Sequence, residues 1–298
     1  MIRWDHDASA FADLLENAAA VLRSSPYRDH SFVRLPRRGR LLVTGDIHDN
    51  VSNFDAVVFA AELCKSSRNH VVLHELIHSD RVVDGLDRSY RMLGYLAELI
   101  VRYPLQVHPV LANHEIAQCR KQQISKGAGN NVEHFDAGLD WAFGEGAQVA
   151  SDAISLFIHA MPLAIRCDNG LMVSHSLPAD NTMHRMDLRV FQRELSDEDF
   201  DGPDGAAYLL TWGRTHAPEH LTRLAYEWSV KAFLVGHSHV PGGVGFREPN
   251  MVILNTDHDE ARVLVVDLER DCPEASVLAT RTRLVHGAFD GVLEAGDA

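Results

Sequence analysis

Hydrophobic and polar positions along the chain follow two periods in turn, which predicts alternating strands and helices. Short runs of branched apolar residues that end in polar ones lie at 40–50, 70–80 and 105–115. Helical spacing of apolar residues follows them at about 53–67, 85–103 and 115–160. Because strand residues alternate between two faces whereas helix residues recur about every 3.6 positions, this succession is typical of an α/β domain.

The second half of the chain continues this alternation. Residues 163–176 predict a β-hairpin, because Asn169 and Gly170 tolerate the positive φ of a tight turn. Two helical stretches then lead to a β-type run within 230–243, and the runs at 251–269 and 275–285 are interpreted as further β-type segments. The chain shows no repeat and no Pro/Gly-rich linker, which favours one α/β domain with an antiparallel C-terminal part.

The patterns also predict how the chain is divided. Residues 1–39 are expected to form an N-terminal helical extension, since Phe11, Leu15, Ala18 and Leu22 recur at helical spacing. The main domain is expected over 40–285, with a mainly helical insertion at about 115–160. A Gly-rich break at 126–131 predicts a loop over the functional site, and 286–298 is expected to be a C-terminal tail.

Composition narrows the classes of partner and compartment. The chain has 298 residues, 46% of them apolar, and a formal net charge of −14. This charge argues against nucleic acid or an anionic membrane as a partner, because binding to phosphate polymers depends on Lys and Arg. The chain has no apolar run of about 18 residues, no signal-peptide pattern at its start and four isolated cysteines, so the prediction is a cytoplasmic protein.

The 18 histidines raise the question of whether they cluster with carboxylates. Each of five β-type runs ends in residues that bind metals or hydrogen bond to metal ligands: Asp46 and His48, His74 and Glu75, Asn113 and His114, His175, and His237 and His239. In open α/β sheets this edge is where ligands bind. A single buried histidine is more often a core residue than a ligand, but repetition at five strand ends indicates a site. The mixture of oxygen and nitrogen donors suits first-row transition metals better than magnesium or calcium.

The ordered blocks G-D-I-H-D-N, V-L-H-E-L-I-H, A-N-H-E, V-S-H-S and G-H-S-H resemble the signature of the calcineurin-like metallophosphoesterases, and most closely its serine/threonine phosphoprotein phosphatase branch. The resemblance covers roughly residues 41–268. It implies a β-sandwich of two mixed sheets flanked by helices, with a dinuclear metal centre between the sheets.

The resemblance also implies roles for individual residues. Asp46, His48 and His239 would hold one metal ion, and Asn113, His175 and His237 would hold the other. Glu75 would bridge the two ions, which would be manganese, iron or zinc, and a hydroxide bridging them would be the nucleophile. His114 would act on the leaving-group oxygen, because it cannot easily reach a metal beside Asn113.

The second block departs from the family pattern at three positions. Glu75 replaces an aspartate, His78 replaces the carboxylate that orients the catalytic histidine, and Ser79 replaces an arginine that grips phosphate. Arg81 and Arg214 are candidates to bind phosphate in its place, and a shifted alignment would make Asp80 the bridge.

Other residues near these blocks are weaker candidates for a role in the site. His78 and Asp49 are candidate supports behind the metal ligands, and Asp257 with His258 could have the same role or lie in a turn. His74 and His78 also have the spacing of a helical H-x-x-x-H zinc site.

Three functions are compatible with these residues. The favoured one is a dinuclear metal-dependent phosphomonoesterase, similar to protein Ser/Thr phosphatases, that acts on a phosphoprotein or a small phosphate ester. A phosphodiesterase or nucleotide pyrophosphohydrolase would use the same centre, and the missing arginine weakens the case for monoesters. The altered second block also allows a metal-binding regulatory protein that has lost turnover. The sequence gives no indication of the oligomeric state.

Overall fold

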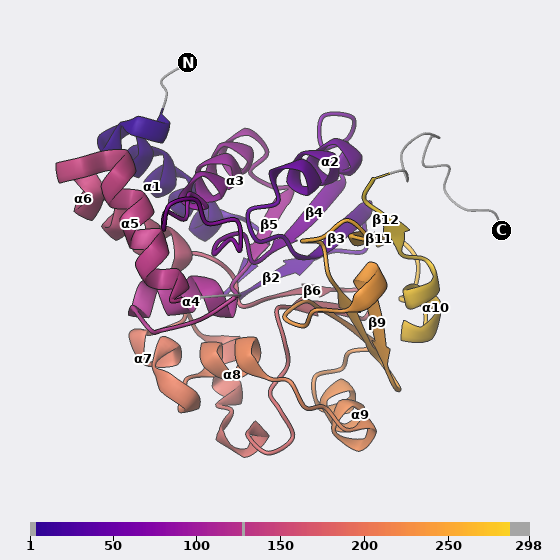
Figure 1. The fold of residues 1–298 in the computed structure, drawn as a ribbon. Helices are drawn as coiled ribbons and strands as arrows, with labels where there is room; N and C mark the ends of the chain where they lie inside the picture. The colour runs from indigo at the N-terminus through magenta and orange to yellow at the C-terminus, as the bar shows by residue number, and fades with distance from the viewer. Residues whose placement is uncertain (1–3, 127–128, 287–298) are drawn as a thin grey trace.

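The computed structural model describes residues 4–126 and 129–286, which form two mixed β-sheets packed face to face with helices on both outer sides (Figure 1). The seven-stranded sheet has the order β1 (Arg28–Asp29), β2 (Phe32–Leu35), β6 (Ala164–Cys167), β7 (Leu171–Ser174), β8 (Ala232–Val235), β10 (Met251–Leu254) and β9 (Val244–Arg247). The five-stranded sheet has the order β12 (Arg283–Leu284), β11 (Arg262–Asp267), β3 (Arg40–Asp46), β4 (Asn69–His74) and β5 (Val107–Val110). Both sheets combine parallel and antiparallel pairs, which confirms the predicted fold class.

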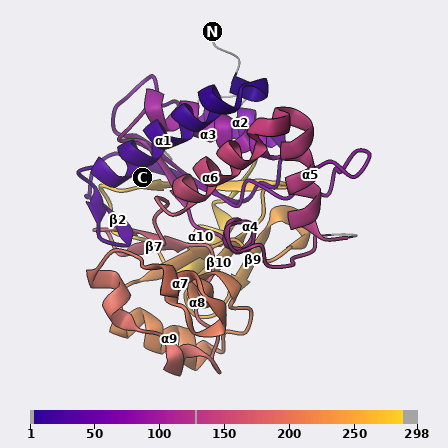
Figure 2. The same cartoon turned by 90° about the vertical axis from the view of Figure 1, so that its left-hand side faces the viewer.

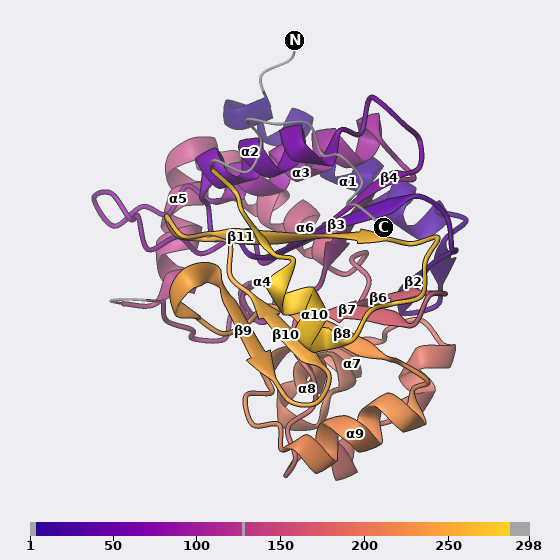
Figure 3. The same cartoon turned by 90° about the vertical axis from the view of Figure 1, so that its right-hand side faces the viewer.

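Helices cover the outer face of each sheet (Figures 1 and 3). On the side of the five-stranded sheet lie α1 (Ala8–Ser24), α2 (Val51–Ala61) and α3 (Tyr90–Arg102), with α5 (Asn131–Phe143) and α6 (Ala147–Ile158) beside them. Figure 2 shows α1 alongside α6, and the two helices are in contact. On the other side lie α7 (Asp197–Phe200), α8 (Ala206–Trp212) and α9 (Pro218–Glu227). The short helix α4 (Asn113–Arg120) follows β5 at the strand ends.

The apolar core has two layers, because alternate residues of each strand face opposite ways. In β8, Leu234 belongs to the layer between the sheets, whereas its neighbour Phe233 belongs to the layer under the helices. β4 has the same alternation, with Val72 between the sheets and Leu73 under the helices. The near-continuous apolar runs of the sequence are therefore strands buried on both faces.

Two close approaches hold the sheets together beside the strand ends that the sequence analysis singled out. Asp46 at the end of β3 pairs with Asn255 after β10 in an isolated bridge, and the Thr256 amide donates to the Asp46 carbonyl oxygen over 3.0 Å. A Cβ atom on Gly45 would lie 1.9 Å from the Leu254 carbonyl oxygen. A side chain at position 45 would therefore push the two sheets apart at this edge.

Most predicted elements are confirmed, and a few differ from the prediction. The hairpin is formed by β6 and β7, with Gly170 at φ 101°. The prediction of β structure for 275–280 was wrong, because α10 (Ala275–Thr280) buries Ala275 and Leu278, three residues apart, on one helical face. The N-terminal segment also holds β1 and β2, and β2 pairs with β6. Residues 127–128 of the predicted loop and 287–298 of the predicted tail lie outside the described residues.

Among the described helices, none combines the length and the apolar character needed to cross a membrane.

Candidate metal centre

A cavity of about 280 Å³ opens at the edge where strands of both sheets end. Its lining is Asp46, His48, Glu75, Asn113, His114, Ser125, Lys126, Arg214, His237, His239, Asn255 and Asp257. Eight of these residues were predicted as site residues from the sequence alone. His175, another predicted ligand, is fully buried beneath the cavity and contacts His237 and Asn113.

The ligand-type residues stand where the strands end. Asp46 is the last residue of β3, Glu75 directly follows β4, and His175 directly follows β7. Asn113 and His114 are the first two residues of α4. Turning the chain sharply at these points requires unusual backbone geometry.

Three of the cavity residues have a positive φ although they are not glycine: His48 at 45°, Glu75 at 39° and His237 at 65°. Non-glycine residues rarely adopt this conformation, and such strain is concentrated at functional sites. A Cβ atom on the neighbouring Gly236 would lie 2.1 Å from Asp46 Oδ1, so glycine is needed beside His237. The backbone is therefore shaped to bring these side chains together.

Asn113, His175 and His237 form one convergent set of donor atoms. Asn113 Oδ1 lies 2.6 Å from His175 Nε2 and 3.0 Å from His237 Nδ1, and the two nitrogens are 3.1 Å apart. No placement of hydrogens makes all three contacts favourable. Two N–H groups would face each other, two bare nitrogens would set their lone pairs against each other, and one of each leaves a mismatched contact with the amide in either of its orientations. A cation among the three atoms removes the conflict.

Glu75 connects this set to a second one. Its Oε2 lies 3.2 Å from His48 Nε2, and its Oε1 lies 3.5 Å from His175 Nε2. Oε1 also accepts a hydrogen bond from the His114 backbone amide over 3.1 Å. Asp46 Oδ1 lies 3.6 Å from His175 Nδ1 and accepts from the His237 amide over 2.9 Å. One carboxylate therefore presents one oxygen to each histidine group.

This cluster buries two carboxylates among neutral histidines, so a cation bound there would stabilise it. Burial, reinforced by the nearby Glu75 carboxylate, raises the pKa of Asp46 to about 8. Burial likewise raises the pKa of Glu75 and lowers the pKa values of His175 and His237. Within residues 4–126 and 129–286, His175 Nδ1 and His237 Nε2 are buried without a hydrogen-bond partner. These are the other nitrogens of the two rings, whose His175 Nε2 and His237 Nδ1 converge on Asn113. Buried carboxylates beside neutral imidazoles with converging nitrogens are the donor set that transition metals bind, so these residues fit a metal centre.

His239 lies at the exposed rim of the same cavity. One ligand atom from each of His239, Asp257 and His258 falls within 4.8 Å of the others. In the described part of the chain, no group of ligand atoms within that distance joins His239 to Asp46 or His48.

The candidate phosphate-binding arginines have different surroundings. Arg214 lines the cavity and donates to the His237 carbonyl oxygen over 3.1 Å. Arg81 donates to the carbonyl oxygens of His48 and Asp257 over 3.1 and 3.2 Å and is absent from the described lining. Asp80, the alternative bridge, is exposed and is also absent from that lining. The geometry therefore favours Glu75 over Asp80 at the centre.

The weaker candidates lie behind the cavity. His78 Nδ1 is 2.9 Å from His114 Nδ1, so it stands where a carboxylate was expected. His74 lies between the sheets with its ring nitrogens near the carbonyl oxygens of Thr44 and Ser174. Residues 75–79 form no helix, so the H-x-x-x-H alternative is wrong. Burial raises the pKa of Asp49 to about 6, and its side chain is not among the described lining.

Sequence reasoning did not single out Lys126 or Asn255 as site residues. Lys126 lines the cavity and its ammonium group contacts the Asp257 carboxylate, whose Oδ1 accepts from Asn255 over 2.9 Å. Lys126 is the first residue of the Gly-rich break that predicted a loop over the site. The signal for Lys126 was therefore its position in the chain.

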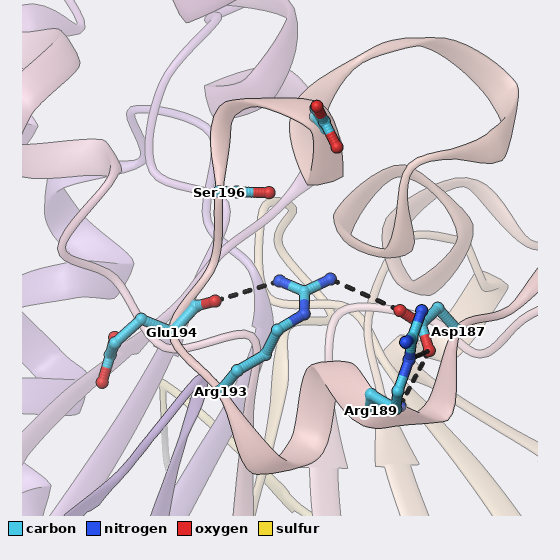
Figure 4. Close-up of a pocket in the computed structure, with 6 residues that line it drawn as sticks. Asp187, Arg189, Arg193, Glu194 and Ser196 are labelled. Carbon is cyan, nitrogen blue, oxygen red and sulfur yellow. Dashed lines mark hydrogen bonds and ion pairs between the residues drawn. The ribbon is translucent and has the colours of Figure 1, made fainter.

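A second cavity, of about 380 Å³, lies among Asp187, Arg189, Arg193, Glu194 and Ser196 (Figure 4). Its cations are paired within the protein. Arg193 donates to both Asp199 oxygens over 2.6 and 2.8 Å, and Arg189 Nε donates to Asp187 over 2.9 Å. Both arginines of this lining are therefore already paired with carboxylates.

Comparison with known proteins agrees with the geometry. Residues 39–241 match the family model of the calcineurin-like phosphoesterases. The chain belongs to this family. Its members are metal-dependent phosphoester hydrolases, and on this basis the chain is a phosphoester hydrolase. No curated protein matches the chain by sequence.

Solved phosphatase structures share the fold. A protein serine/threonine phosphatase from Saccharomyces cerevisiae has a TM-score of 0.63 at 16% identity, over 87% of this chain and 82% of that one. A cold-active protein-tyrosine phosphatase from Shewanella has a TM-score of 0.55 at 12% identity, over 84% of this chain and 80% of that one. At these identities the likeness concerns the fold of the calcineurin-like phosphoesterase and not its substrate.

Proposed function

We propose that the chain is a dinuclear phosphomonoesterase whose two metal ions share Glu75. The observation that carries this proposal is the placement of the Glu75 carboxylate, with one oxygen 3.2 Å from His48 and the other 3.5 Å from His175. A carboxylate bridges two cations when each of its oxygens faces one of them. Glutamate is one methylene longer than the family's aspartate, and we expect it to reach both ions from its position directly after β4.

The residues divide into two sets of ligands around Glu75. Asp46 and His48, with His239 at the rim, would hold one ion, and Asn113, His175 and His237 would hold the other. When bound, two transition-metal ions, manganese, iron or zinc, supply Lewis acidity and an activated water for attack on phosphorus.

The remaining cavity residues act on the substrate. His114 lines the cavity, is neutral because burial lowers the pKa of its ring, and is placed to exchange a proton with the leaving-group oxygen. Lys126 and Arg214 are the basic side chains in the described lining. They would bind the nonbridging oxygens of the phosphate, as the arginine does that the family has at the position of Ser79.

A phosphomonoester is favoured over a diester because of these two cations. A monoester dianion carries one more negative charge than a diester, so its binding gains more from Lys126 and Arg214. The substrate is a phosphoprotein side chain or a small phosphate ester, since both present the same terminal phosphoryl group. A phosphodiesterase activity would use the same ligands with less need for the cations.

Metal analysis combined with an ester screen tests the proposal. Protein purified without chelators is expected to hold two metal equivalents, and with added manganese to hydrolyse an aryl phosphate faster than the corresponding aryl diester. A faster diester reaction would instead support a phosphodiesterase. Two bound metals with no hydrolysis of either ester would support a regulatory protein, and absence of bound metal would overturn the proposed centre.

A further inference from the structure

His114 is held by a chain of hydrogen bonds that ends at a carboxylate on another helix. His114 Nδ1 lies 2.9 Å from His78 Nδ1, and His78 Nε2 lies 2.9 Å from Gln118 Oε1. Gln118 Nε2 donates to Asp136 Oδ1 over 2.7 Å. The same Asp136 oxygen accepts from the Lys121 ammonium over 2.6 Å. The chain thus runs from α5 through α4 to the cavity.

Every proton in this chain has one consistent position. The Asp136 oxygen accepts from Lys121, so Gln118 must turn its NH₂ group toward Asp136 and its carbonyl oxygen toward His78. The reverse orientation of the amide would set two oxygens 2.7 Å apart. His78 must then donate from Nε2 to Gln118, which leaves Nδ1 of its neutral ring as an acceptor. Burial lowers the pKa of His78 to about 3, which keeps that ring neutral.

The local packing holds His78 in this position. Its backbone amide donates to Ser89 Oγ over 3.0 Å, and its backbone has a positive φ of 63°. The ring lies edge-on to Phe135, one residue before Asp136, at a centroid distance of 5.6 Å. The described surroundings of His78 that carry charge or titrate are His114, His48 and Lys121. Gln118 and Asp136 therefore set the direction in which hydrogen bonds are donated from His114 to Asp136.

We propose that Gln118 and Asp136 are positioning residues that, through His78, fix the proton of His114 on Nδ1 and direct its Nε2 to the leaving group. This inference rests on the proposed phosphoesterase function. To act as the acid, His114 must first take up a proton from solvent on its bare Nε2, and it then gives that proton to the departing oxygen. An acceptor at His78 Nδ1 supports the doubly protonated ring that exists between these two transfers. A hydrogen on His78 Nδ1 would oppose that form. The His78, Gln118 and Asp136 chain would thus replace the single carboxylate expected at position 78.

The first test measures the tautomer of His114 directly, without activity. In ¹⁵N-labelled, zinc-loaded protein at neutral pH, NMR should show His114 protonated on Nδ1 and bare on Nε2. Comparison with a His114→Gln variant assigns the resonances. Protonation of His114 on Nε2 would overturn the inference.

The second test uses esters that differ in their need for a proton. An alkyl phosphate has a basic leaving group, whereas dinitrophenyl phosphate has an acidic one that departs without help. In Gln118→Leu, kcat for the alkyl phosphate should fall by roughly a hundredfold while kcat for dinitrophenyl phosphate changes little. An equal loss for both esters is the result of a merely structural role and would contradict the inference.

Two further variants control this test. Gln148→Leu removes an exposed glutamine on α6 that donates to Asp152 over 2.8 Å. Gln148 lines a small cavity together with Gln118 and Lys121 but is not part of the hydrogen-bonded series from Asp136 to His114, so its removal should leave both reactions unchanged. Gln118→Glu combined with Asp136→Asn exchanges amide and carboxylate but keeps an acceptor facing His78, and should retain the alkyl phosphate reaction. If Gln118→Leu does not fold, this double variant and the NMR experiment decide the question. Wild-type protein that hydrolyses neither ester would overturn the proposed function, while the tautomer would still test the relay.

Discussion

Two histidine clusters lie at opposite edges of the β-sandwich, and they have opposite characters. Past the carboxyl ends of β3, β7 and β8, His48, His175 and His237 lie beside Asp46 and Glu75. At the amino ends of β4 and β5, His70 and His108 stack on each other in the layer between the sheets, with His70 Nδ1 3.1 Å from His108 Nε2. Tyr27 packs against both rings. The two clusters are equally buried.

The two clusters differ in whether carboxylates lie beside the histidines. His70 and His108 are hydrogen bonded to each other, and His70 is also hydrogen bonded to the Leu105 backbone, so the neutral pair is a structural element of the core. The cluster at the carboxyl ends contains acidic groups whose pKa values burial raises, together with unpaired ring nitrogens. Histidine number alone does not identify a metal centre, whereas histidines converging on buried carboxylates do.

The largest expected effect comes from Asp46→Asn. This change keeps the shape of the side chain but removes its charge, so kcat/KM for an aryl phosphate should fall by at least roughly a hundredfold. The matched change at the other cluster, His70→Asn, keeps a polar partner for His108 and should leave steady-state activity unchanged. Comparable losses in the two variants would break the distinction between the clusters.

Metal removal should destabilise variants of the two clusters to different extents. A ligand present at a thousand times its Kd stabilises the folded state by about 4 kcal/mol, so chelation should lower the free energy of unfolding of the wild type by that order. His70→Asn should show the same loss on chelation, measured by denaturant titration. Asp46→Asn should show a much smaller one. An undiminished loss in Asp46→Asn would place the stabilising metal elsewhere.

Low pH should reduce the stability that the buried pair of His70 and His108 contributes to the folded protein. Burial lowers the pKa of His70 from its ordinary 6.5 to about 4, so the unfolded chain takes up a proton at a higher pH than the folded protein does. The stabilisation is present above pH 6.5 and is lost as the pH falls toward 4, which amounts to about 3 kcal/mol for this one group. In chelated protein, the free energy of unfolding of His70→Asn should vary less over this range than that of the wild type. Parallel pH profiles of the two proteins would refute this role of His70.

The smallest effect is expected at Lys126. Its ammonium group contacts Asp257 at the cavity wall and is placed to bind phosphate. Lys126→Ala should raise KM for an aryl phosphate by roughly tenfold, about 1.4 kcal/mol, with metal content unchanged. Arg189→Ala removes a cation from the second cavity and serves as the matched control, since it should leave KM unchanged. A fall in kcat at constant KM would instead assign Lys126 a role in the chemical step.

The sequence allowed the strands and their chemistry to be predicted because both depend on local patterns. Continuous apolar runs predicted strands such as β3 and β8. The polar residues that directly follow these runs in the sequence predicted the site that lines the cavity. The partners of β2 and the helical state of α10 depend on contacts with residues far along the chain, so local patterns did not indicate them. His78 shows the same limit, because its hydrogen bonds come from Gln118 on α4 and Asp136 on α5.

Anomalous diffraction from crystals of manganese-loaded protein tests the central claim most directly. The account predicts two anomalous peaks, one beside His48 and one between His175 and His237, each within bonding distance of a different oxygen of Glu75. A single peak, or peaks that do not contact Glu75, would contradict a dinuclear centre that shares this carboxylate.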